Sequence, residues 1–141
     1  MLEDFFNKDY WVVDFLPKQV PENAGGKFFS VEQYYLEPSR YAVLREQFSD
    51  VLLKLYCYYD LQLFVDDDTE GVANPEPELL ASYIKDNHHN LCILIGTSEA
   101  LITLGRDDTN LTVYAPYEDL LELIKTLAEA VGLFVWKPKQ L

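Results

Sequence analysis

The clearest pattern in the chain is a series of apolar residues spaced three and four apart, with polar residues between them. The first series consists of Tyr41, Leu44, Phe48, Val51, Leu55 and Tyr58. This spacing places one apolar stripe along a helix, so it predicts a long amphipathic helix that begins at Ser39. A second series over residues 117–131, opened by Pro116 and closed by Gly132, predicts another long helix.

Two shorter helices are predicted from capping and proline signals. Ser30 and Gln33 have the spacing of a capping box, and Phe29 is expected to pack on Tyr34, so a helix should begin there and end before Pro38. Residues 77–87 begin with a proline suited to a first helical turn and carry one apolar face. This second segment is therefore also expected to be a short helix.

Strands are expected where β-branched, aromatic or aliphatic residues form short runs bounded by turn residues. These runs are residues 10–16, 61–65, 91–95, 100–104, 111–114 and 133–136. The run 91–95 is continuously apolar, which is typical of a central strand covered on both faces. Residues 66–74 are expected to form a loop. The predicted fold class is α+β, with a largely antiparallel sheet of five or six strands packed by two long amphipathic helices and one or two short ones.

The length of 141 residues suits one domain spanning residues 1–141. The first residues are acidic and lack the apolar core of a signal peptide, so we expect a cytoplasmic protein. Cys57 and Cys92 sit in apolar surroundings without a Cys-x-x-Cys spacing, so both are expected to be buried, free thiols.

The chain is strongly acidic, and the charge is unevenly distributed. The net charge is -13, and residues 61–120 hold twelve acidic and only two basic residues. A field of this sign disfavours nucleic acids and anionic membrane surfaces as partners. It favours a basic protein partner instead.

The densest acidic segment begins like a calcium-binding loop. Asp66, Asp68 and Glu70 alternate and are followed by Gly71, but Pro77 stands at the twelfth position, where a glutamate ligand is needed. A solvated acidic loop is therefore the preferred interpretation. We predict no metal site and no cofactor.

An alternative hypothesis is a metal-dependent hydrolase or ligand-binding enzyme. It would use the 66–70 loop together with Asp86 and either His88 or His89. Adjacent histidines diverge in regular structure, so they cannot both chelate one ion. A turn around Ser98 resembles a nucleophile elbow but has Ala100 in place of the second glycine. Because no nucleophile is paired with a base, we predict that the protein is not an enzyme.

The leading hypothesis is a small interaction module of the inhibitor or immunity kind that binds a basic partner. Six of the ten tyrosines fall between residues 34 and 59, and tyrosine is favoured in protein interfaces. The predicted partner-binding residues are Asp66, Asp67, Asp68, Glu70, Tyr35, Tyr56 and Tyr59. The acids would steer the encounter and the tyrosines would hold the complex. Homodimer formation through the tyrosine-rich helix is a further alternative.

Overall fold

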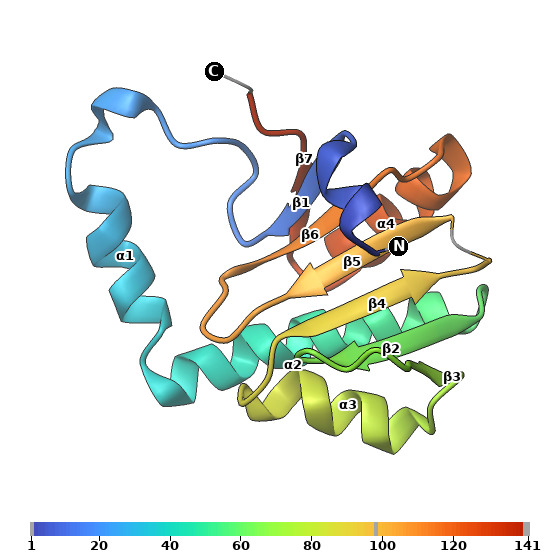
Figure 1. Ribbon diagram of the computed structural model, residues 1–141. Helices are drawn as coiled ribbons and strands as arrows, with labels where there is room; N and C mark the ends of the chain where they lie inside the picture. Colours follow the sequence, from blue (N-terminus) through green and yellow to red (C-terminus); the bar gives the residue numbers. More distant parts are fainter. Residues whose placement is uncertain (1, 98, 140–141) are drawn as a thin grey trace.

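One antiparallel sheet organises the chain, as the computed structural model shows for residues 2–97 and 99–139 (Figure 1). Within these residues it has seven strands in the order β3-β2-β4-β5-β6-β1-β7. The strands are β1 (Tyr10–Asp14), β2 (Leu61–Val65), β3 (Val72–Ala73), β4 (Leu91–Ile95), β5 (Ala100–Leu104), β6 (Asn110–Tyr114) and β7 (Phe134–Trp136). The α+β class and the antiparallel sheet are confirmed.

The predicted strand number was too low because β3 is not visible in the sequence pattern. This strand has two residues, both exposed, inside the segment expected to be a loop. It pairs with β2 through Gln62 and Leu63. A Cβ atom at Gly71 would lie 2.6 Å from the Gln62 side chain, so the glycine permits this close approach.

Six helical segments accompany the sheet in the described part of the chain. They are the 3-10 helices η1 (Leu2–Asn7) and η2 (Glu22–Ala24) and the helices α1 (Lys27–Tyr35), α2 (Pro38–Tyr56), α3 (Pro77–Asp86) and α4 (Glu118–Ala130). Proline begins α2 and α3, and Asn87 ends α3 in the left-handed conformation. None of the described helices has the length and apolar character needed to span a bilayer.

The main core lies between one face of the sheet and helices α2, α3 and α4. Alternate residues of β2, β4, β5 and β6 meet the apolar stripes of these helices. Phe48, Leu52 and Ile93 are among the fully buried side chains. Figure 1 shows these helices behind and below the sheet.

The opposite face of the sheet carries a smaller apolar cluster under η1. Phe5 packs there against Phe64, Leu94 and Leu101. In Figure 1 this N-terminal helix lies in front of β5. The part of this face near β1 and β7 is instead bordered by the segment that leads from β1 to α1.

Helix α1 differs from its predicted form. It begins at Lys27, and the Ser30 hydroxyl donates a hydrogen bond to the Gly26 carbonyl rather than capping the helix. The predicted packing of Phe29 on Tyr34 is wrong, because Phe29 is 66% exposed and contacts Phe28. No residue of α1, all of which are described, is buried.

A buried cation connects three elements at one end of the sheet. Arg45 of α2 is 1% exposed. Its Nε donates to the Ile84 carbonyl at 2.5 Å, and its Nη1 donates to the Gly105 carbonyl at 3.1 Å and to the Tyr41 hydroxyl at 3.2 Å. The Tyr41 hydroxyl in turn donates to the Asp108 carbonyl. Arg45 thus holds the end of α3 and the β5–β6 loop onto α2.

We predict that Arg45→Met lowers the free energy of unfolding by about 3 kcal/mol, because the buried Ile84 carbonyl and the half-buried Gly105 carbonyl lose a charged donor. Urea denaturation followed by circular dichroism measures this change. Arg106→Met, on an exposed arginine in the adjacent loop, is the control and should change stability by less than about 0.5 kcal/mol. Equal effects of the two substitutions would contradict the role assigned to Arg45.

Candidate functional site

Three loops meet where β2 and β5 end and β4 and β6 begin. We call loops 66–70, 86–90 and 105–109 together the acidic edge, which lies on the left in Figure 1. The three loops contain seven acidic residues, and Arg106 is their only lysine or arginine. The acids are Asp66, Asp67, Asp68, Glu70, Asp86, Asp107 and Asp108, and all seven are exposed.

The first two loops are joined through Asp66. Its carboxylate accepts a hydrogen bond from the Asn90 backbone amide at 3.0 Å and lies 2.6 Å from Nδ1 of His89. The Asn90 amide and the His89 ring hold the pKa of Asp66 below its ordinary value. Asp66 therefore keeps its negative charge while it fixes the position of the α3–β4 loop.

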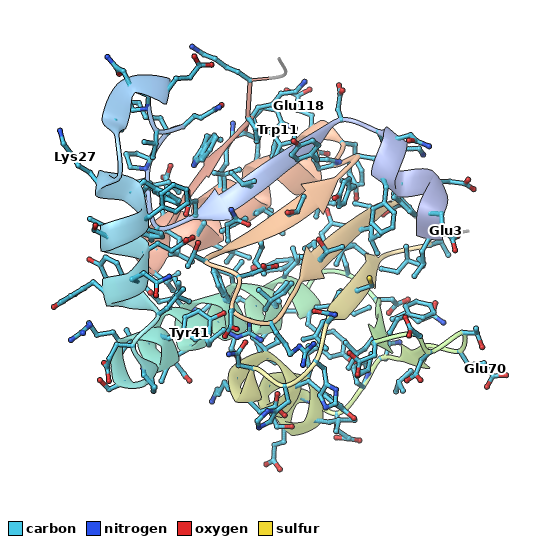
Figure 2. All side chains as sticks on the ribbon, turned by 60° about the vertical axis from the view of Figure 1, so that its left-hand side comes forward. Glu3, Trp11, Lys27, Tyr41, Glu70 and Glu118 are labelled. Atoms are coloured by element: carbon cyan, nitrogen blue, oxygen red, sulfur yellow. The ribbon has the colours of Figure 1, made fainter. Side chains whose placement is uncertain are left out.

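The second and third loops are joined by asparagine side chains. The Asn87 amide donates to Asp107 Oδ1, and the Asp107 backbone amide donates back to Asn87 Oδ1, both at 2.8 Å. The Arg106 amide donates to Asn90 Oδ1 at 3.1 Å. These bonds leave the carboxylates exposed on a loop framework of defined geometry. Figure 2 shows Glu70 at the right-hand margin of the molecule and well apart from Tyr41, whose hydroxyl donates to the Asp108 carbonyl of the third loop.

The residues of the metal-site alternative are only partly brought together. His89 contacts Asp66, whereas Asp86 accepts a hydrogen bond from the His88 backbone amide at 3.1 Å. Among the described residues, no three acidic, histidine or cysteine side chains converge as a metal site would require. Ser98, the residue at the centre of the elbow-like turn, lies outside the described residues.

The structure separates the predicted tyrosines from the predicted acids. Tyr56 donates to the Pro75 carbonyl, and Tyr59 contacts the Tyr117 ring, so both lie near the start of β2. Asp66 follows the end of that strand. Tyr35 lies instead on α1, where its ring contacts Phe15. Only Tyr35 is therefore close to the end of the sheet that carries the acidic edge.

One expectation about the cysteines is wrong. Cys57 is exposed because it caps α2 at the point where the helix leaves the core, and Cys92 is half-buried on the η1 side of the sheet. Both thiols are free. Burial raises the pKa of the Cys92 thiol.

A cavity that the sequence did not suggest lies beside the end of β1. It has a volume of about 350 Å³ and is bordered by β1, β6, β7, the β1–α1 segment and the start of α1. Asp14, Glu22 and the aromatic rings of Phe28, Phe29 and Trp136 line it. The described lining residues include no lysine, arginine or histidine. The one available signal was an aspartate at an otherwise apolar position inside the predicted strand 10–16.

Asp14 is the chemically unusual group of this cavity, since it is a carboxylate only 5% exposed. Its Oδ1 accepts a hydrogen bond from the Phe15 amide at 2.8 Å. Burial raises the pKa of the Asp14 carboxyl from 3.8 to about 6, against the opposing effect of the neighbouring amides and the Trp136 indole. The charge of Glu32 on α1 adds to the rise. Shifts of this kind are typical of functional sites.

The comparisons with known proteins give no relative. No protein-family model, no curated protein and no solved structure matches this chain. The residues themselves therefore carry the functional argument.

We predict that Asp14→Asn stabilises the protein at neutral pH by about 2–3 kcal/mol, because the wild-type chain must bury a charge that the unfolded chain keeps in water. A carboxyl whose pKa is raised by folding stabilises the native state below pH 3.8, and this stabilisation is lost as the pH rises through about 6. The difference in the free energy of unfolding between Asp14→Asn and the wild type should therefore be smaller by about 1 kcal/mol at pH ~5 than at neutral pH. Urea denaturation at the two pH values measures it.

The control for this prediction is Asp67→Asn, which removes one exposed charge of the acidic edge. It should change the free energy of unfolding by less than about 0.5 kcal/mol at either pH. A destabilising effect of Asp14→Asn at neutral pH would show that the Asp14 charge is already compensated in the folded chain.

Proposed function

We propose that this chain is a non-enzymatic interaction module that binds a basic protein partner through the acidic edge. The observation that carries the proposal is that three loops with seven exposed carboxylates meet at one end of the sheet. In the sequence these residues span more than forty positions. In the fold they form one region, whose loops are hydrogen-bonded to each other.

A fixed anionic region of this kind acts mainly on the encounter with a partner. Exposed charges of one sign accelerate association with a surface of opposite sign and exclude acidic competitors. The hydrogen bonds at Asp66, Asn87 and Asn90 hold the loop backbones in place, so little conformational entropy is lost when a partner binds. The acidic edge therefore supports specific steering better than a flexible acidic tail would.

Helix α1 supplies an apolar surface next to the acidic edge. Thr109 donates a hydrogen bond to Glu32 of α1 at 3.1 Å, which ties this helix to the β5–β6 loop. Phe29, Tyr34 and Tyr35 of α1 are exposed. Exposed aromatic rings bury much area at a small cost in entropy, so they suit the contact that follows charge-steered encounter. Tyr56 and Tyr59 would join the interface only for a partner that extends along β2.

Titration of isotope-labelled protein with a linear hexalysine peptide tests the proposal by NMR. We expect amide shifts in loops 66–70, 86–90 and 105–109, because these loops carry the exposed carboxylates. The shifts should weaken strongly between about 0.05 M and 0.5 M salt, since screening shortens the range of the attraction. The triple variant Asp67→Asn, Asp68→Asn, Glu70→Gln should weaken binding about tenfold.

The matched control is the triple variant Glu118→Gln, Glu122→Gln, Glu129→Gln on α4, which changes the net charge by the same amount. Figure 2 places Glu118 and Glu70 in different parts of the molecule. Binding should fall no more than about twofold in this control, because α4 is not part of the acidic edge. Equal losses in the two triple variants would mean that only the total charge matters, and the proposal would fail.

A further inference from the structure

We propose that the cavity beside Asp14 binds a guanidinium group, whose positive charge pairs with the Asp14 carboxylate while its plane stacks on the aromatic wall. The inference goes beyond the proposed function, because the cavity can bind such a group whether or not the acidic edge binds a protein. The volume of the cavity, about 350 Å³, is within the range of small-ligand sites.

The charge of the cavity selects a cation. Asp14 and Glu22 line it, and the negative charge of Glu32 on α1 adds to the rise in the pKa of Asp14. The Asp14 carboxylate accepts a hydrogen bond from the neutral Phe15 amide, and the other groups that lower its pKa, the Leu16 amide and the Trp136 indole, are also neutral. The described lining residues supply no positive charge, so the buried negative charge remains uncompensated in the free protein. A bound cation would offset the unfavourable free energy of burying the Asp14 charge without a partner.

The walls of the cavity select a guanidinium over a compact ammonium. Trp136 and Phe28 provide flat apolar surfaces, and Trp136 is fixed because its indole donates to the Leu16 carbonyl at 3.0 Å. A planar guanidinium stacks on such rings and presents forked donors to a carboxylate, whereas an ammonium keeps a tighter hydration shell. The chain itself uses this arrangement at Arg40, which lies over the Tyr34 ring at 3.6 Å and beside Glu37.

Asp14 also makes binding depend on pH. Its pKa of about 6 leaves it mostly ionised near neutral pH and mostly protonated at pH ~5. The charged groups that face it are Glu32 from α1 and Glu22 from η2, whereas β6 and β7 contribute the uncharged Asn110 and Trp136. Guanidinium binding should therefore weaken about tenfold between pH ~7 and pH ~5.

NMR titration with three probes tests the inference, using the two indole signals of the chain. The probes are the peptide acetyl-Gly-Arg-Gly-amide, its neutral citrulline counterpart and methylguanidine. Trp136 lines the cavity, whereas Trp11 lies on the other face of β1 beside Lys125 and serves as an internal control. We expect a saturable shift of the Trp136 indole with both guanidinium probes, half-complete at about 1 mM or below, and none with citrulline.

Asp14→Asn keeps the shape of the carboxyl but removes its charge, and it should weaken binding at least about tenfold. Because this variant is expected to be more stable than the wild type, unfolding cannot explain the loss. The acidic-edge triple variant Asp67→Asn, Asp68→Asn, Glu70→Gln should alter binding by less than about twofold, which separates this inference from the proposed function.

The probes also distinguish the source of the guanidinium group. Binding of the arginine peptide at least about fivefold tighter than methylguanidine identifies a protein side chain, and the reverse order identifies a small free molecule. Three results would overturn the inference. They are no saturable Trp136 shift up to about 20 mM, equal shifts with the citrulline peptide, or unchanged binding in Asp14→Asn.

Discussion

The buried guanidinium of Arg45 is the interaction on which the functional end of the molecule depends. It donates to the carbonyls of Ile84 and Gly105, one at the end of α3 and the other at the start of the β5–β6 loop. Both loops that follow these carbonyls belong to the acidic edge. A cation inside the fold therefore positions anions on its surface, since Arg45 donates to backbone carbonyls and a tyrosine hydroxyl and leaves the aspartates free to face solvent. The stability of the core and the geometry of the candidate binding surface are in this way coupled.

The carboxylates near the acidic edge lie in two different environments, one hydrated and one buried. At the acidic edge the carboxylates are hydrated, and bonds such as those between Asn87 and Asp107 order the loops at little desolvation cost. At Asp14 a single carboxylate is buried beside aromatic rings, where burial raises its pKa to about 6. The first arrangement suits long-range attraction, and the second suits recognition of one group at short range. The Thr109–Glu32 hydrogen bond connects the β5–β6 loop to α1, whose first residues border the cavity.

Much of the fold could be predicted because it follows from periodicity. The three-four spacing from Tyr41 to Leu55 and the apolar run Leu91–Ile95 each matched their observed elements closely. Val72 and Ala73 could not be recognised as a strand, since two exposed residues give no alternation. The acids of the 66–70 loop could be located from composition, but their meeting with residues 105–109 depends on tertiary contacts. Asp14 could not be interpreted from sequence, because only the enclosure formed by β7 and α1 makes its charge unusual.

Recognition of a cation in the cavity depends on a negative charge that the folded chain leaves without a compensating cation at Asp14. The most direct measurement is a pH titration of the Asp14 side-chain carboxyl carbon by NMR, in the protein without added ligands. A midpoint near pH 6 is the result that the structure predicts. A midpoint at or below about pH 4, the value of a solvated aspartate, would show that the carboxyl is hydrated or paired and would contradict the account.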